Sequence, residues 1–267
     1  MIKPGEIQNK AREVGVRDTQ IEKDYVLSWI LQGIANHKRL SRAMVFKGGT
    51  VLKKVYFEDY RFSEDLDFTF IDNDNSTEKI FEWFTEVFEY VREEANIPLE
   101  IIGHNKHEDG GINFYISYIG PLGGLGVNKK IKVDISRSEQ LVFDPTERSV
   151  FLGYSDQEEH QLLCYPIEEI LVEKLRAVMQ RMQARDFYDI WYLLEIHRMD
   201  VELYLNEFKA KCENKEINPT DFHNKLEQRM PQYKGRWKTS MASQIQDLPD
   251  FDQMAREVSR QLKKLEF

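Results

Sequence analysis

The chain has few cysteines and no obvious segment for a membrane or for export. Its 267 residues include two cysteines, Cys164 and Cys212, which form neither a disulfide framework nor a metal-ligand spacing. No apolar run approaches the ~20 residues that a membrane-spanning helix needs. The first residues, Met1 to Glu6, contain no apolar signal core. We therefore expect a cytoplasmic protein without membrane contact.

Positive charge is outnumbered by negative charge, with 37 Lys and Arg against 46 Asp and Glu. The net charge of −9 argues against broad, charge-driven binding of nucleic acid, because phosphate contacts need Lys and Arg. Local basic patches remain compatible with this balance, although most charge clusters are simply solvated surface. The chain is 41% hydrophobic and 31% charged, which is typical of a globular protein with a sizeable core.

Apolar periodicity divides the chain into two parts. The first part contains predicted helices over residues 6–40 and from Ser76 or Thr77 onward, and predicted strands over 43–47, 66–71, 99–103, 112–119 and 130–135. From Pro166 the pattern is helical to the end, with breaks near Asn218-Pro219 and Leu248-Pro249. We expect an α+β half and a helical half, with the boundary between residues 150 and 165.

Two carboxylates stand on alternate residues at the start of one predicted strand. Asp65 and Asp67 would point to the same face, because side chains i and i+2 of a strand share a face. Like charges on one face repel each other unless a cation lies between them, and Mg²⁺ takes one or two carboxylates together with substrate phosphates. A solvated acidic edge strand is the alternative interpretation.

Two glycines and a threonine end the preceding strand. Gly48, Gly49 and Thr50 open a helical segment that extends to Tyr56. Backbone N–H groups at such a helix start bind phosphate, the glycines let phosphate oxygens approach, and Thr50 adds a hydroxyl donor. Alone, Gly-Gly-Thr is usually a turn. Next to the acidic pair, it favours a site for a phosphate and a metal ion.

A third carboxylate belongs to the predicted strand over residues 130–135. Asp134 alternates with Ile131, Val133 and Ile135, which places it opposite a buried set. It would complete a metal site or activate a nucleophile, or it would simply lie exposed on a half-buried strand.

The helical half places charges on apolar faces. Lys174 lies on the apolar stripe of its helix, where an ammonium group either extends outward to solvent or pairs with an anion. Asp186 and Asp189 border the next packing face. They would pair with Lys174 or Arg185, cap the helix, or orient a reacting group.

Together these residues resemble the AbiEii/AbiGii toxin family of nucleotidyltransferase-like proteins, in the superfamily of DNA polymerase beta. The resemblance extends from residue 22 to about residue 194 and rests on five motifs in order: Glu22-Lys23-Asp24-Tyr25, Arg61-Phe62-Ser63-Glu64-Asp65-Leu66-Asp67, Lys132-Val133-Asp134, Glu173-Lys174-Leu175 and Arg185-Asp186-Phe187-Tyr188-Asp189. The remaining C-terminal residues match only in being helical.

The resemblance implies a polymerase-beta-like core over residues 1–160, with a mixed sheet flanked by helices. A helical lobe over residues 161–267 would close the active-site cleft. The family's functional residues match positions throughout both parts. The implied catalytic residues are Asp65, Asp67, Asp134, Lys174 and Asp186. Asp65 and Asp67 would also bind the metal, and the nucleotide would be bound by Gly48, Gly49, Thr50, Ser63 and Lys174. Arg185 and Asp189 would support the site.

Membership would imply a Mg²⁺- or Mn²⁺-dependent toxin of a type IV-like toxin–antitoxin or abortive-infection pair in phage defence. The enzyme would transfer a nucleoside monophosphate from a nucleoside triphosphate to RNA, most plausibly the 3′ end of tRNA. Its companion would be a winged-helix antitoxin. Two alternatives remain open: a phosphotransferase that modifies a protein or small molecule, which the net charge of −9 favours, and a non-catalytic nucleotide-binding partner of a regulator.

Overall fold

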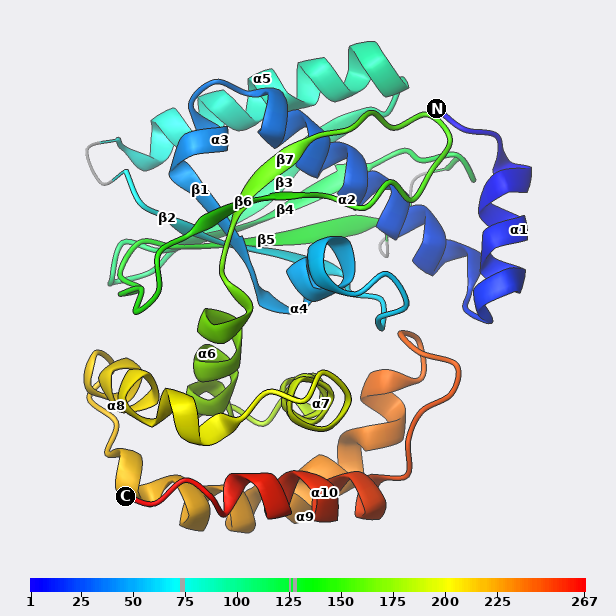
Figure 1. Ribbon diagram of the computed structural model, residues 1–267. Coiled ribbons are helices and arrows are strands. Elements are labelled where there is room, and N and C mark those ends of the chain that lie inside the picture. The colour runs from blue at the N-terminus through cyan, green and yellow to red at the C-terminus, as the bar shows by residue number, and fades with distance from the viewer. Residues whose placement is uncertain (73–74, 125, 127–128) are drawn as a thin grey trace. The chain divides into compact units, whose positions relative to one another are not determined.

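The computed structural model divides into two compact units and describes residues 1–72, 75–124, 126 and 129–267 (Figure 1). The first unit comprises Met1–Glu139 and Pro145–Tyr165, and the second comprises Gln140–Asp144 and Pro166–Phe267. Every strand among the described residues belongs to the first unit, while the second is helical. The chain therefore has the α+β architecture with a helical C-terminal part that its sequence predicts.

The first unit is built on a mixed sheet of seven strands. The strands are β1 (Met44–Lys47), β2 (Asp65–Phe70), β3 (Leu99–Lys106), β4 (Ile112–Tyr118), β5 (Lys130–Ser136), β6 (Thr146–Ser149) and β7 (Gln161–Cys164). Their order across the sheet is β3-β4-β5-β2-β1-β7-β6. β2 pairs in parallel with β5 and antiparallel with β1, and β1 pairs in parallel with β7. This order puts β2 in the interior of the sheet.

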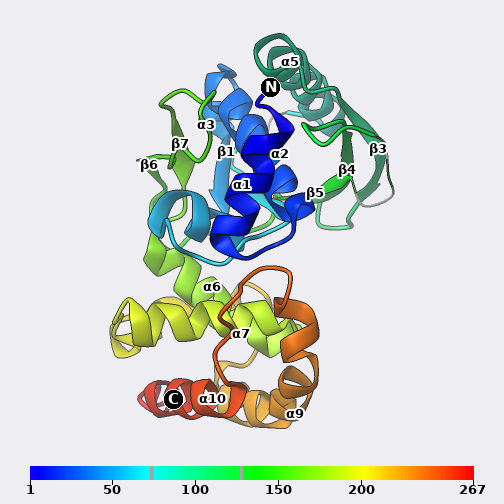
Figure 2. The same cartoon turned by 90° about the vertical axis from the view of Figure 1, so that its right-hand side faces the viewer.

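The first unit also contains five helices and one π-helical turn among its described residues. They are α1 (Pro4–Val14), α2 (Asp18–Asn36), α3 (Leu40–Ala43), α4 (Gly48–Val51), the π-helical turn η1 (Leu52–Tyr56) and α5 (Thr77–Ala95). Figure 1 shows α2 and α5 on the same side of the sheet, and Figure 2 shows α1 beside α2. The helical stretch expected over residues 6–40 is interrupted at Gly15, whose φ of 67° gives α1 a left-handed C-cap.

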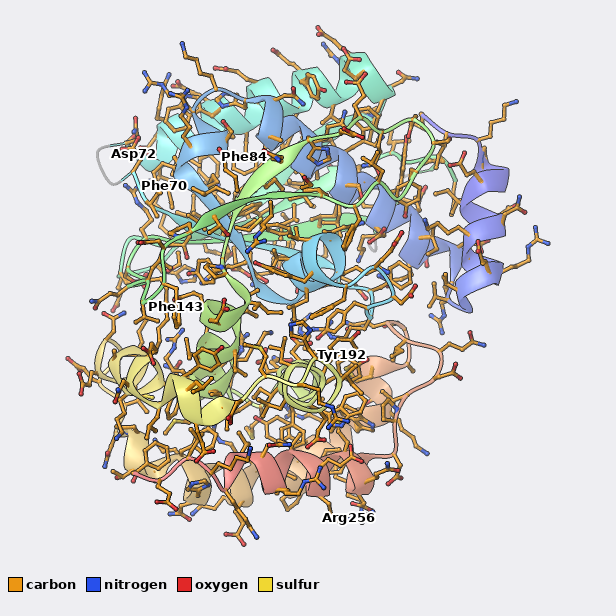
Figure 3. The ribbon with its side chains drawn as sticks, viewed as in Figure 1. Phe70, Asp72, Phe84, Phe143, Tyr192 and Arg256 are labelled. Atoms are coloured by element: carbon orange, nitrogen blue, oxygen red, sulfur yellow. The ribbon has the colours of Figure 1, made fainter. Side chains whose placement is uncertain are left out.

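Aromatic packing shows which strand residues face the helices. The ring of Phe70 on β2 lies 6.5 Å from that of Trp83 on α5, and Phe114 on β4 lies 4.9 Å from Phe84 (Figure 3). Because side chains alternate along a strand, Phe70 and Phe68 face the helix layer while the odd-numbered residues of β2 point to the opposite face. The carboxylates of β2 are therefore directed away from the core formed by the sheet and the helices.

The second unit consists of short and medium helices. They are α6 (Ile167–Gln180), α7 (Ala184–Trp191), the π-helical turn η2 (Tyr192–Ile196), the 3₁₀ turns η3 (Val201–Tyr204) and η4 (Pro219–Asp221), α8 (Leu205–Glu213), α9 (Phe222–Met241) and α10 (Phe251–Leu262). The ring of Phe187 stacks on Tyr233 at 5.3 Å, and the rings of Trp237 and Phe251 lie 5.6 Å apart. Figure 3 marks Phe143, which packs against Tyr204 of the same unit at 6.1 Å.

Two strands escaped the sequence analysis. β6 reads Thr-Glu-Arg-Ser and is largely exposed, and β7 has four residues. Neither carries a periodic pattern long enough to distinguish a strand from a loop. β7 matters for the site because it pairs with β1 and thereby fixes the strand that leads into Gly48. No helix among the residues described is both long and apolar enough to cross a membrane.

Candidate active site

The register of three strands gathers charged residues on one face of the sheet. Asp67 lies directly opposite Lys47 of β1 and directly opposite Asp134 of β5. Asp65 lies opposite Lys132 of β5. Residues that are directly opposite in neighbouring strands share a face of the sheet. The fold thus brings the three carboxylates together on one face, with Lys47 opposite Asp67 and Lys132 opposite Asp65.

These carboxylates are neither buried nor fully solvated. Asp65, Asp67 and Asp134 are each half-buried, while Leu66 and Phe68 beside them are completely buried. β2 has a strand on either side of it, so Asp65 and Asp67 do not lie on an edge strand. The alternative of a solvated acidic edge is therefore wrong.

Lys132 supplies positive charge within this face. Its Nζ lies 2.6 Å from Oδ2 of Asp134, and both side chains are 34% exposed. Burial acts to lower the pKa of Lys132, but the hydrogen bond and charge of Asp134, together with the charges of Asp65 and Asp67, raise it above its ordinary value. Lys132 stays protonated and partly neutralises the carboxylates.

Gly48 allows the turn after β1 to approach a carboxylate. Its φ of 79° is a conformation that side chains rarely adopt. A Cβ at this position would lie 2.3 Å from Oδ2 of Asp67, which is inside the van der Waals distance. The first glycine of the motif is therefore required by backbone conformation and by the closeness of Asp67.

Thr50 contacts the backbone of Asp65, and Ser63 precedes Asp65 in the chain. The Thr50 hydroxyl donates a hydrogen bond to the carbonyl oxygen of Asp65, and the Thr50 side chain is buried. Ser63 is 5% exposed and stands two residues before Asp65. Gly49 is also buried, in the first turn of α4. The hydroxyl of Thr50 thus holds the start of β2, a role that the sequence did not reveal.

The carboxylates Asp65 and Asp67 are suited to a hard divalent cation that takes its other ligands from a substrate. Within the described ranges, no three His, Cys, Asp or Glu side chains form a complete metal cluster. Asp65 and Asp67 nevertheless present carboxylate oxygens from one face, beside a turn that leaves no room for a side chain at Gly48. Mg²⁺ commonly takes only one or two protein carboxylates and completes its shell with phosphates and water.

The second unit contains a separate network of buried charges. Lys174 Nζ on α6 lies 2.7 Å from Oδ1 of Asp186 and 2.7 Å from Oδ2 of Asp189, both on α7. The three side chains are 7%, 1% and 0% exposed. Lys174 therefore does not extend to solvent; it pairs with the two carboxylates.

A second cation completes this network. Arg181 donates from Nε to Oδ2 of Asp186 at 2.7 Å and from Nη2 to Oδ1 at 3.1 Å. Burial acts to raise the pKa of Asp186, but the charges of Lys174 and Arg181 and their hydrogen bonds outweigh it and lower that pKa well below its usual range. Asp186 is thus ionised in the folded protein.

Sequence reasoning found most of this network but not all of it. Lys174, Asp186 and Asp189 meet as one of the weighed alternatives predicts. Arg181 was not assigned to the site, and its five-residue spacing from Asp186 carries no helical signal because the chain breaks between α6 and α7. Arg185 is half-buried in the first turn of α7.

Comparison with known proteins agrees with the fold and with the family resemblance. The family model described as "Nucleotidyl transferase AbiEii toxin, Type IV TA system" matches residues 29–257, and the chain therefore belongs to this family of type IV toxin–antitoxin nucleotidyltransferase toxins. No protein of curated function matches the chain.

Solved structures share the fold at low sequence identity. MenT4, a nucleotidyltransferase toxin from Mycobacterium tuberculosis H37Rv, superposes with a TM-score of 0.60 and 17% identity over 99% of this chain and 89% of its own. JHP933 from Helicobacter pylori gives 0.58 and 16%, over 94% and 93%. A putative nucleotidyltransferase from H. pylori gives 0.57 and 19%, over 94% and 100%.

Proposed function

We propose that this protein transfers a nucleoside monophosphate from a nucleoside triphosphate to an RNA acceptor, specifically the 3′ end of tRNA, with Mg²⁺ or Mn²⁺. One observation carries the proposal: Asp65, Asp67 and Asp134 share one face of the sheet, beside a glycine turn that approaches Asp67. Family membership supports the reaction class.

In this proposal each residue of the first unit has a separate role. Asp65 and Asp67 hold the divalent ion, which when bound would neutralise triphosphate charge and favour departure of pyrophosphate. Gly48 and Gly49 would offer backbone N–H groups to a phosphate, and Ser63 would contribute to the nucleotide site. Thr50 orients Asp65 through its carbonyl oxygen.

The bond changes define the role of Asp134. The acceptor hydroxyl forms a bond to the α-phosphorus as the bond to the β-phosphate oxygen breaks and pyrophosphate leaves. The hydroxyl proton must go to a base or to water. Asp134 is the candidate base, since it is half-buried and directly opposite Asp67 in the sheet.

We assign the network of the second unit to the triphosphate. Lys174 would contact phosphate oxygens, and Asp186 and Asp189 would hold its ammonium group in place until the substrate binds, with Arg185 in support. This assignment requires residues 161–267 to act as a lobe that closes over residues 1–160, and closure would exclude water from the reacting groups.

The family also suggests a partner. A type IV toxin is encoded with an antitoxin, and we propose a winged-helix protein in that role, in an abortive-infection system against phage. Co-expression with the neighbouring reading frame would test it: restored growth of cells that express this protein supports the pairing, and continued arrest argues against it.

The transfer reaction itself is tested with purified protein, total RNA, Mg²⁺ and each nucleoside triphosphate labelled at the α-phosphate. Label in a tRNA-sized band that disappears with Asp65→Asn establishes the reaction and identifies the nucleotide. Label transferred to protein from γ-labelled ATP, with none on RNA, would replace this proposal by a phosphotransferase. No metal-dependent nucleotide binding at all would indicate a non-catalytic module.

A further inference from the structure

The motif Glu22-Lys23-Asp24 on α2 contributes no residue to the candidate site, yet its side chains are almost entirely enclosed. Glu22 is 0% and Asp24 3% exposed, and the Lys23 side chain is 15% exposed. Each of the three contacts a different segment of the first unit. Those three segments are the ones that carry the candidate site residues of that unit.

Glu22 contacts residues that precede β5 in the chain. Its Oε1 accepts hydrogen bonds from the backbone N–H of Leu122 at 2.8 Å and from Nζ of Lys129 at 3.0 Å. A Cβ at Gly120 would lie 2.7 Å from the same oxygen, so that glycine is needed to admit the carboxylate. Lys129 immediately precedes β5, the strand of Asp134.

Lys23 holds the start of β2. Its Nζ lies 2.9 Å from Oε2 of Glu64, whose side chain is 34% exposed. Glu64 is the residue directly before Asp65, so this ion pair fixes the backbone at the point where the acidic pair begins.

Asp24 holds the helical turn after the glycines. Its Oδ2 lies 2.7 Å from Nζ of Lys54 and accepts from the hydroxyl of Tyr154 at 2.8 Å, while Lys54 also donates to Ser28 Oγ at 2.7 Å. Lys54 belongs to η1, which continues the helix that starts at Gly48. A π-helical turn at this place is typical of functional sites.

Stability alone is a weak reason for these contacts. Burying Lys54 acts to lower its pKa more than Asp24 raises it, which shows that the ammonium group is costly where it lies. A buried ion pair is often no better for stability than apolar residues of the same volume. These contacts instead serve to fix geometry, because each one holds one segment at a defined place relative to α2.

We propose that Glu22, Lys23 and Asp24 are positioning residues that set the three site segments of the first unit in register with one another. The proposal rests on the proposed function for the identity of the site. Outer contacts of this kind commonly change metal affinity or activity about 10–100-fold when they are removed, although they never touch the metal.

The pair of Lys23 and Glu64 gives the sharpest test, because positioning and plain electrostatics predict different results. If charge near Asp65 were all that mattered, Lys23→Met would tighten binding of a divalent cation and Glu64→Gln would weaken it. Positioning predicts that both variants weaken Mn²⁺ binding to the full chain by about tenfold. The double variant should be no weaker than either single variant, and Lys23→Arg should retain the affinity of the unaltered protein.

Mn²⁺ affinity is measured by electron paramagnetic resonance of the free ion, and melting temperature is recorded for each variant. Lys106→Ala is the matched control, since it removes an ion pair with Glu78 at 2.7 Å between β3 and α5 of the same unit. The control should bind Mn²⁺ normally. Glu22→Gln, which keeps an oxygen acceptor for Leu122, should retain more affinity than Glu22→Ala.

Unchanged Mn²⁺ affinity in Lys23→Met, tighter binding in that variant, or a loss that only parallels a lower melting temperature would overturn the proposal. So would absence of Mn²⁺ binding in the unaltered protein. Failure of the proposed function has a different signature: the unaltered protein binds Mn²⁺ but transfers no nucleotide, and the comparison among the variants still decides whether the three residues position the site.

Discussion

Two sets of carboxylates in this molecule differ in burial and in how their charge is balanced. On the sheet of the first unit, Asp65, Asp67 and Asp134 are half-buried, and Lys132 pairs with Asp134. In the second unit Asp186 and Asp189 are 1% and 0% exposed, and Lys174 lies 2.7 Å from each. Both sets lie within residues 29–257, which match a single family, yet they differ in their surroundings.

The difference indicates which set is available to a dissolved cation. A buried carboxylate without a partner is very costly, so Asp186 and Asp189 need Lys174 for the second unit to fold. Half-buried carboxylates keep part of their hydration and tolerate mutual repulsion, so Asp65 and Asp67 can accept a cation together with a substrate. The first set is therefore the one to which we assign cation binding, whereas the second holds the ammonium group of Lys174.

The largest expected effect is on catalysis by the first set. Asp67→Asn should reduce nucleotidyl transfer by about a thousandfold, because a bound metal contributes several kcal/mol to charge stabilisation in the transition state. The unfolding free energy should change far less than for a buried ion pair, because Asp67 is half-buried and water screens the charge interactions that it loses. Single-turnover rates and a thermal melt measure both quantities. Asp59→Asn, at an exposed position, is the control.

A marked loss of stability in Asp67→Asn, or full activity, would break the comparison. The first result would mean that Asp67 is a structural residue like those of the second unit. The second would mean that the metal is held elsewhere.

The second set should respond in the opposite way. Asp186→Asn removes one partner of a buried ion pair and should lower the unfolding free energy by about 3 kcal/mol, because Lys174 loses a charged partner that it cannot replace with water. Urea denaturation measures the loss. A variant as stable as the unaltered protein would show that Asp189 alone is enough to balance Lys174.

The pH dependence of stability checks the same network. The pKa of Asp186 is lowered in the folded state, so its contribution is present above the ordinary Asp range near pH 4 and is lost as pH falls below it. The gap in unfolding free energy between the unaltered protein and Asp186→Asn should therefore narrow on acidification. A gap that stays constant between neutral pH and about pH 3 would contradict the ion-pair account.

The sequence predicts much of the first unit because its central strands carry clear signals. Apolar residues alternate along β2, β4 and β5, and Asp65, Asp67 and Asp134 occupy the other positions of that alternation. Family resemblance supplied the order of the motifs. Even so, the parallel pairing that puts Asp67 opposite Asp134 joins strands far apart in the chain, and no local pattern predicts such a register.

Most of the contacts that the sequence could not reveal are long-range and between polar groups. Lys23 with Glu64, Asp24 with Lys54 and Glu22 with Lys129 join α2 to segments 30 to 107 residues away. Periodicity reports which face of a helix is apolar, whereas partners of buried charges depend on the tertiary fold. The same limit applies to Arg181, whose contact with Asp186 depends on the turn between α6 and α7.

Removing the positive charge of Lys132 should have a smaller effect, which is on the affinity for Mn²⁺. Lys132→Met should tighten Mn²⁺ binding in the absence of nucleotide by about fivefold, the scale of ~1 kcal/mol for one charge near a solvated ion. Lys130→Met, on the same face of β5 but exposed, is the control and should change the affinity less. Weaker binding in Lys132→Met would show that this lysine organises Asp134 rather than opposing the metal.

The smallest expected effect concerns the two thiols, and it tests whether the units differ in stability as well as in charge. Burial raises the pKa of Cys164 in the first unit to about 12 and that of Cys212 in the second to about 11. Both are 0% exposed, so neither should react with a thiol reagent in the native protein at neutral pH. In Cys164→Ala and Cys212→Ala variants, the remaining thiol reports the opening of one unit as urea increases. The buried ions of the second unit depend on one another. We therefore expect Cys212 to become reactive at a lower urea concentration in Asp186→Asn than in the unaltered protein, while Cys164 stays protected. Simultaneous exposure of both thiols would show that the two units unfold together.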